Sequence, residues 1–191
     1  MDSFEIAWAP EPGAAATRTG QFMTVHGIPD YDTLVSRSTS DPEWFWEAVV
    51  DYLSLPFEPR WTVLRDTSRG HPWATWFVGA GFNLSVACVD RWAGEDPQRV
   101  AIRWQRESGA GGETTFGELL DQVGRLAGAM ISLGVGRGDA VAVYLPMSPE
   151  AVISLLAVAR IGAIFVPVFS GYAAEAVSTR LHDPKPRLMV T

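Results

Sequence analysis

Residues 139–172 read DAVAVYLPMSPEAVISLLAVARIGAIFVPVFSGY, and this stretch decides the fold of the chain. An apolar run of strand length, residues 140–145, precedes the tripeptide Ser-Pro-Glu at residues 148–150. Ser is a common helix N-cap, Pro suits the first helical position, and Glu favours the positive end of a helix. Residues 151–161 contain no helix breaker, and Gly162 stands where a helix ends at positive φ. The stretch therefore predicts a strand followed by a helix.

Three further elements continue this pattern toward the C-terminus. Residues 163–169 predict a second strand, residues 173–182 a helix, and residues 187–190 a third strand. Strands that alternate with helices at this spacing indicate a parallel sheet, and nearly all-apolar strands are typical of a sheet covered on both faces. We therefore predict an α/β fold: a partial doubly wound parallel sheet with flanking helices, preceded by a mostly helical or irregular, aromatic-rich N-terminal extension.

A hairpin and a long helix are predicted immediately before this region. Residues 100–105 and 114–116 are separated by a Gly-rich turn and predict two antiparallel strands. Thr115 and Glu118 form a capping box, and apolar residues then recur at helical spacing up to Gly134.

The aromatic-rich extension begins its clearest helix at SDPE, residues 40–43. Either Ser40 and Glu43 form a capping box, or Asp41 caps the helix. Aromatic residues over 44–53 fall on helical spacings, so this stripe could bind a ligand or pack as core. Because helical aromatic stripes are usually core, we expect it to dock the extension onto the main domain.

The following segment is irregular and leads to one more helix. Residues 56–81 are rich in Pro, Trp and Gly and predict an ordered strap across the main domain. Asn83 can cap a helix that runs to Trp92, with Gly94 as its stop. Cys88, the only cysteine, lies inside this helix and is predicted to be a buried, inert thiol.

Several segments resemble the N-terminal domain of the AMP-forming acyl-CoA synthetases, and acetyl-CoA synthetase and its near relatives in particular. They are YLPMSPEAV (144–152), ARIGAI (159–164), VFSGYAAEAV (168–177), and, upstream, WFVGAGFNLS (76–85) and CVDR (88–91). The resemblance implies a ligase that makes an acyl-adenylate from a carboxylate and ATP and then transfers the acyl group to CoA.

The resemblance covers residues 30–191 and implies an organisation of the chain. Residues 1–20 show no periodicity and are predicted to be a flexible leader. Residues 21–82 would be the acetyl-CoA-synthetase-like extension, and residues 83–191 the first α/β subdomain of a truncated adenylation domain. ATP, Mg²⁺ and CoA are the cofactors that the full-length family enzyme would use.

The catalytic motifs of that family have no counterpart in this chain. Its phosphate loop is rich in Ser, Thr and Gly and ends in Lys-Gly, whereas the only lysine here, Lys185, lies between two prolines. The GVGRG stretch at 134–138 follows a helix instead of a strand, so it is not a dinucleotide fingerprint. We therefore predict no catalytic residue, no tight cofactor binding and no adenylation activity for the chain alone, and we leave open whether it is an enzyme.

Composition excludes other classes of function. The formal net charge is −7 with no basic cluster, which argues against nucleic-acid binding. His26, His71 and His182 are far apart and none has a second ligand at metal-binding spacing, so no metal site is predicted. The apolar run 151–169 contains Arg160, whose burial in a lone membrane span costs at least about 2.5 kcal/mol. We predict a buried helix and strand there, and a cytoplasmic protein.

One loop is a candidate binding site. Phe169, Ser170 and Gly171 end a predicted parallel strand, and ligands bind at the carboxyl edge of such sheets. The resembling family usually has Phe-Gly-Gly-Phe here, and that loop lines its CoA entrance. This chain departs at Ser170 and Tyr172, and Ser170 adds a Cβ where the family has glycine. The alternative is a simple strand-to-helix turn.

Two functions follow from these observations. The first is the N-terminal portion of a ligase for a short-chain carboxylate, whose partner would be the missing downstream part of the adenylation domain. The second is a stand-alone, non-catalytic module that binds a CoA-like ligand or a protein partner. A last strand at 187–190 without its neighbours would favour self-association of the isolated chain.

Overall fold

The computed structural model describes residues 14–191, so residues 1–13 of the predicted leader lie outside the described residues. Chain contacts define two compact units. The first contains the chain up to Leu55 together with Arg60–Ala80, and the second contains Pro56–Pro59 together with Gly81–Thr191. Each unit has its own core, and we describe them separately.

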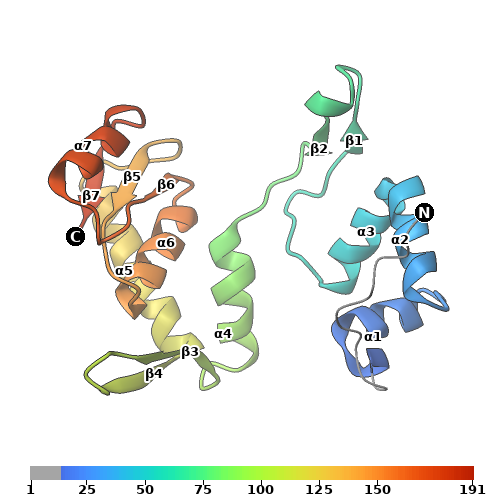
Figure 1. Ribbon diagram of the computed structural model, residues 1–191, viewed down its shortest axis with the longest axis horizontal. Coiled ribbons are helices and arrows are strands. Elements are labelled where there is room, and N and C mark those ends of the chain that lie inside the picture. Colours follow the sequence, from blue (N-terminus) through green and yellow to red (C-terminus); the bar gives the residue numbers. More distant parts are fainter. Residues whose placement is uncertain (1–13) are drawn as a thin grey trace, which may run out of the picture. The chain divides into compact units, whose positions relative to one another are not determined.

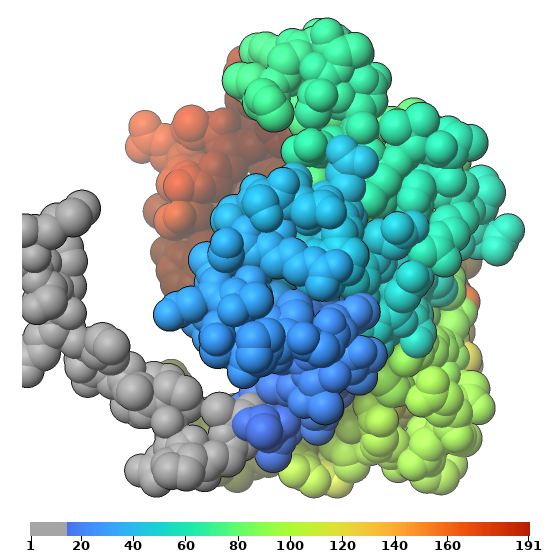
Figure 2. Space-filling model, turned by 90° about the vertical axis from the view of Figure 1, so that its right-hand side faces the viewer, coloured from blue at the N-terminus to red at the C-terminus, as the bar shows by residue number. Residues whose placement is uncertain are grey.

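The first unit consists of short helices and one small antiparallel sheet. Its elements are η1 (Ala14–Ala16), α1 (Arg18–Val25), α2 (Tyr31–Ser40), α3 (Pro42–Tyr52), β1 (Val63–Asp66), η2 (His71–Trp73) and β2 (Thr75–Val78). The helix α1 begins inside the range predicted as a leader, because the Thr17 side chain accepts a hydrogen bond from the Gly20 N–H and caps it. Figure 2 shows the residues of α1 to α3 in blue to cyan.

The aromatic stripe of α3 forms core within the first unit. Phe22 is 5% exposed, and the rings of Phe45 and Tyr52 lie 6.2 and 5.3 Å from its ring. Asp41, not Ser40, caps α3: its carboxylate accepts the Trp44 N–H at 3.0 Å, while Ser40 is the last residue of α2.

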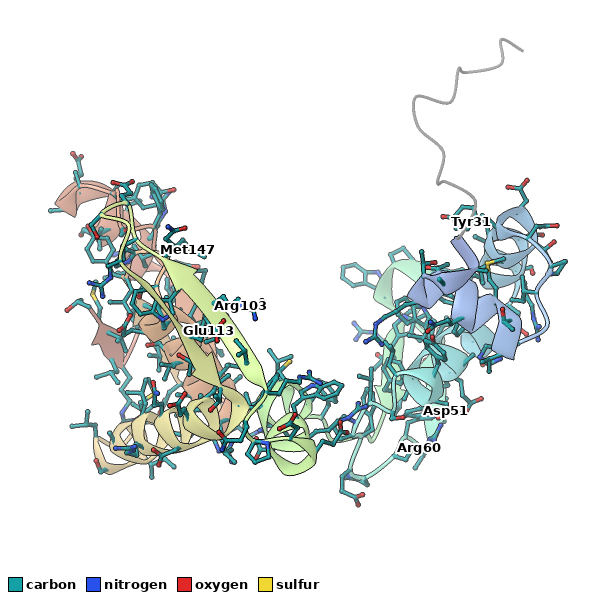
Figure 3. All side chains as sticks on the ribbon, turned by 90° about the horizontal axis from the view of Figure 1, so that it is seen from below. Tyr31, Asp51, Arg60, Arg103, Glu113 and Met147 are labelled. Carbon is teal, nitrogen blue, oxygen red and sulfur yellow. The ribbon has the colours of Figure 1, made fainter. Side chains whose placement is uncertain are left out.

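The segment predicted as an ordered strap contains two paired strands. β1 and β2 are antiparallel, with Val63 opposite Val78 and Arg65 opposite Trp76. Each strand has only four residues and no clean alternation of apolar and polar side chains, which is why the sequence pattern did not reveal it. In the same unit, Arg60 Nη2 lies 2.6 Å from Asp51 Oδ1, and Figure 3 labels both residues.

The second unit contains the predicted α/β fold. Its elements are η3 (Val86–Asp90), α4 (Arg91–Glu95), β3 (Val100–Gln105), β4 (Gly111–Thr115), α5 (Phe116–Ser132), β5 (Ala140–Val143), α6 (Pro149–Arg160), β6 (Ile164–Pro167), α7 (Ala174–His182) and β7 (Leu188–Val190). The sheet order is β6-β5-β7 and both pairings are parallel, which confirms the predicted fold class. Figure 1 shows α5 and α6 beside this sheet.

The core of the second unit is built around β5. Val141 in this middle strand is fully buried and lies opposite Phe165 of β6 and Leu188 of β7. From α5 and α6, fully buried side chains such as Val123 and Val158 complete the same apolar cluster. The apolar run that could have indicated a membrane span is thus α6 and β6 of a globular core. No helix in residues 14–191 is long and apolar enough to cross a membrane.

Local sequence signals place most of these elements correctly. The hairpin of β3 and β4 forms as predicted, and the Arg103–Glu113 ion pair labelled in Figure 3 bridges its strands at 2.6 Å. The capping box of Thr115 and Glu118 is complete, with hydrogen bonds of 2.8 and 3.3 Å. Gly162 has a φ of +71°, as its place after α6 requires.

The prediction for Cys88 is wrong, because the helix that carries it buries other side chains and leaves Cys88 exposed. Asn83 Oδ1 accepts the Ser85 and Val86 N–H groups at 2.9 and 3.3 Å, so Asn83 caps this helix as predicted. The helix then contains a π-helical turn over Val86–Asp90. Val89 is fully buried while Cys88 is exposed, and the helix continues through Gly94 to Glu95.

An ion pair joins this helix to the end of α6. Arg160 Nη1 and Nη2 each lie 2.7 Å from an oxygen of Asp90, and Nη1 also lies 3.2 Å from Ser85 Oγ. The hydrogen bond with Asp90 raises the pKa of Arg160 above its ordinary value. The side chains of Arg160 and Asp90 are only 28% and 29% exposed. A bidentate, largely desolvated pair of this kind is stronger than an exposed one.

Replacing the arginine of this pair should therefore destabilise the second unit. We expect Arg160→Met to lower the free energy of unfolding by about 2 kcal/mol, because Asp90 would keep its charge without its partner. The matched control is Arg103→Met, whose side chain is 77% exposed and should cost less than about 1 kcal/mol. Urea unfolding followed by far-UV circular dichroism measures both, and equal losses would contradict the prediction.

Candidate binding edge of the sheet

The candidate site lies at the carboxyl edge of the parallel sheet. Backbone pairing continues past the strand ends there: the Tyr144 N–H donates to Val190 O and the Val168 N–H donates to Val143 O, each at 2.9 Å. Val168 is 3% exposed, so the chain leaves the core directly after it. The segment from Phe169 to Tyr172 therefore follows directly after backbone that is hydrogen-bonded to the sheet.

The predicted loop residues do come together at this edge. The Tyr172 N–H donates to Phe169 O at 3.0 Å and closes a turn around Ser170 and Gly171. The Phe169 side chain is 65% exposed, and its ring lies edge-on to the Tyr172 ring at 5.4 Å. Arg180 of α7 lies over the Tyr172 ring at 3.9 Å. The loop thus carries an exposed aromatic ring on an ordered turn.

Ser170 occupies its place in the turn without a left-handed backbone. The non-glycine residues of positive φ in the described part of the chain are Ser54, Phe77 and Lys185. The Cβ that Ser170 adds relative to the family pattern therefore requires no conformation that only glycine adopts. Gly171 does have a steric role, since a Cβ there would lie 2.6 Å from Cε1 of Phe169.

Sequence reasoning missed the residue that holds this loop. The Tyr144 hydroxyl lies 3.0 Å from Ser170 O and 2.9 Å from Tyr172 O, and it can donate to both. In the sequence, Tyr144 is the first residue of the segment YLPMSPEAV. The available signal was its place as the first side chain with a polar group after the buried strand β5.

A shallow groove lies beside the loop. It measures about 630 Å³ and is lined by Tyr144, Ala174, Val177, Ser178, Leu181 and His182. Most of these residues come from α7, which contributes no buried residue of its own. Within residues 14–191, no three His, Cys, Asp or Glu side chains gather closely enough to hold a metal ion. The carboxyl edge of the sheet thus carries aromatic rings, hydroxyl groups and the backbone groups of a turn, all of which can contact a ligand.

The start of α6 completes the edge. Ser148 has the extended backbone of an N-cap, but its side chain does not cap a helix N–H. The Ser148 hydroxyl instead hydrogen-bonds the Glu150 carboxylate and, with the Glu150 N–H, lowers the pKa of that group. Next to it, Met147 is 97% exposed and is labelled in Figure 3.

Comparison with known proteins identifies the class. Residues 89–191 match the family of AMP-binding enzymes, and residues 31–88 match the acetyl-coenzyme A synthetase N-terminus. The chain belongs to the family of AMP-binding enzymes, which confirms the predicted resemblance. The predicted domain boundary at 82/83 lies between the boundary of the compact units at 80/81 and the family boundary at 88/89.

The particular relatives are CoA ligases. The chain is 38% identical over 169 residues to acetyl-coenzyme A synthetase 2 of Eremothecium gossypii, a match that covers 87% of this chain and 24% of that protein. It is 40% identical over 162 residues to propionate–CoA ligase of Salmonella typhimurium, covering 84% and 25%.

A solved structure of acetoacetyl-CoA synthetase from Streptomyces lividans superposes with a TM-score of 0.85 at 30% identity, covering 92% of this chain and 28% of that one. The chain therefore spans about a quarter of the length of these relatives.

The carboxylate at this edge yields a prediction about pH. Ser148→Ala should raise the pKa of Glu150 toward its ordinary value, because the stabilising hydroxyl is lost. A lowered pKa in the folded state stabilises the fold above the ordinary value and loses that effect as the pH falls through the folded pKa. The variant should therefore lose less stability than the parent chain on acidification.

Titration of the Glu150 carboxyl by NMR measures this change. The control is Ser132→Ala, which removes a hydroxyl that donates to the Ala129 carbonyl at the end of α5. An identical Glu150 titration in the parent chain and the Ser148 variant would contradict the prediction.

Proposed function

We propose that this chain is the N-terminal portion of a ligase that activates a short-chain carboxylate with ATP and transfers the acyl group to CoA. One observation carries the proposal: residues 31–191 match an acetyl-coenzyme A synthetase N-terminus and an AMP-binding enzyme in succession. The names of three similar proteins, an acetyl-, a propionate- and an acetoacetyl-CoA ligase or synthetase, support a short-chain acid as the substrate class.

The side chains and backbone groups of this chain are better suited to binding CoA than to binding ATP. CoA carries a thiol on a flexible arm that contains amide groups, and such an arm can pack on an aromatic ring and bond to a backbone turn. The exposed Phe169 ring and the turn at Ser170 and Gly171 offer both. We propose that these three residues line the CoA entrance.

Adenylation requires groups that this chain does not supply. Phosphate transfer chemistry needs backbone amides around a phosphate, a positive side chain and ligands for Mg²⁺. The sequence has no Ser/Thr/Gly-rich loop ending in Lys-Gly, and its only lysine is Lys185. We therefore propose that ATP and Mg²⁺ are held by the rest of a longer, cytoplasmic protein, and that the chain alone binds none of its cofactors tightly.

The decisive experiment compares the chain with the protein that its gene encodes. Sequencing the reading frame beyond Thr191 shows whether it continues, and the encoded protein and the chain of residues 1–191 are then purified in parallel. Acetate, propionate and acetoacetate are tested for carboxylate-dependent exchange of pyrophosphate into ATP and for CoA-dependent formation of AMP. We expect activity from the longer protein and only background from residues 1–191.

Two results would overturn this proposal. A stop codon after Thr191 would favour the non-catalytic module that binds a CoA-like ligand or a protein partner. Exchange above background by residues 1–191 would contradict the expected inactivity of this portion.

We further propose that the downstream part of the ligase covers the outer strands and α7. In the described sheet, β6 and β7 each pair with β5 alone, and unpaired strand edges bind other chains. Val177 and Leu181 of α7 line an open groove. Without its continuation, the chain of residues 1–191 should self-associate or be marginally stable.

Light scattering over a range of concentrations tests this expectation. The apparent mass should rise with concentration for residues 1–191 and stay constant for the longer protein. A monodisperse monomer of residues 1–191 with a cooperative, concentration-independent melt would defeat the proposal.

A further inference from the structure

Tyr144 stands at the junction between the rigid sheet and the exposed loop. Its backbone N–H donates to Val190 O, so it extends the pairing of β5 with β7. The residue before it, Val143, is 4% exposed and lies in the middle strand. Tyr144 therefore directly follows the strand β5, which pairs with a neighbouring strand on each side.

The hydroxyl of this ring joins two points of the loop. Ser170 O and Tyr172 O lie 3.0 and 2.9 Å from it, one on each side of Gly171. A phenol has a single hydrogen, so this hydrogen is shared between the two carbonyl groups as a three-centre bond. Both carbonyl groups consequently point inward to Tyr144, and the turn between them is held at its two ends.

This arrangement leaves the Phe169 ring directed away from the core. The ring is 65% exposed and touches Tyr172 edge-on at 5.4 Å. The backbone of the turn itself contributes one hydrogen bond, from the Tyr172 N–H to Phe169 O. The Tyr144 hydroxyl adds a side-chain contact between this turn and the strand that precedes Tyr144.

We infer that Tyr144 is a positioning residue for the loop of Phe169, Ser170 and Gly171, and through it for the thiol-bearing arm of CoA. The inference rests on the proposed function, since CoA is the ligand proposed for this loop. Tyr144 would not touch the reacting atoms. Its hydroxyl would keep the loop in the conformation that receives the arm, so that binding does not have to order the loop.

Hydrogen exchange on residues 1–191 tests the positioning role without any ligase activity. In Tyr144→Phe the ring stays and only the hydroxyl is lost. We expect amides of the loop to exchange roughly five to ten times faster, as the loss of about one net hydrogen bond predicts. Amides of β5 should be unchanged, which shows that the fold is intact.

The matched control is Tyr31→Phe in the other compact unit. Tyr31 is 64% exposed, and its substitution should leave exchange in the loop unchanged. A second measurement needs no variant: in the parent chain with labelled tyrosine, NMR should detect a slowly exchanging Tyr144 hydroxyl proton close to Gly171. Unchanged loop exchange in Tyr144→Phe, or a freely exchanging hydroxyl in the parent chain, overturns the inference.

Kinetics of the longer protein test the role toward CoA. Tyr144→Phe should raise KM for CoA about fivefold, and it should leave carboxylate-dependent pyrophosphate exchange, which precedes CoA, unchanged. Equal losses in both steps would indicate a general structural effect and would overturn the CoA role. A longer protein without ligase activity would refute the proposed function, and the exchange experiment would still decide whether the hydroxyl holds the loop.

Discussion

The ion pair of Arg160 with Asp90 is the constraint on which the second unit depends. Arg160 ends α6, and its guanidinium binds both carboxylate oxygens of Asp90 and the hydroxyl of Ser85. Ser85 and Asp90 are five residues apart. In a regular α-helix, residues at this spacing point about 140° away from each other, so one guanidinium could not contact both Ser85 and Asp90. The π-helical turn between Ser85 and Asp90 brings them onto one face. The π-helical turn thus lets the Arg160 guanidinium contact Ser85 and Asp90 together.

Neighbouring contacts reinforce this junction. Asn83 caps the same helix with its side-chain oxygen and donates with its amide nitrogen to Arg160 O at 3.0 Å. Two of the carbonyl groups at the C-terminus of α6, those of Ala159 and Arg160, therefore accept from a residue 76 and 77 positions earlier in the chain. With α6 fixed in this way, the buried side chains of α6 and α5 can pack against β5 in one well-defined arrangement.

At the carboxyl edge, the opposite end of the sheet, the chain passes from buried to exposed residues. At the carboxyl edge the chain leaves the core at Val168 and presents Phe169 to solvent, while Tyr144 ties the turn to the middle strand. In α/β enzymes, loops that bind ligands commonly follow the carboxyl ends of the strands, and the rigid sheet holds them in position. This arrangement agrees with the proposed function, in which this chain contributes ligand contacts and the groups for phosphate chemistry come from elsewhere.

The sequence by itself determined the features that local physics controls. The alternation of apolar strands and helices predicted the parallel sheet, and Thr115 with Glu118 predicted the start of α5, because the signal for each strand or helix lies within that element or beside it. The candidate loop at Phe169, Ser170 and Gly171 was predicted in the same way, from its place after a strand.

Tertiary structure alone decided the features whose partners are distant in the chain. The helix that carries the exposed Cys88 is joined through Asp90 to Arg160, 70 residues further along the chain. The pairing of β1 with β2 also joins residues that are distant in the chain. The same holds for the hydrogen bonds of the Tyr144 hydroxyl with carbonyl groups 26 and 28 residues away. Local patterns reveal which elements form, whereas only folding brings together the groups that anchor them.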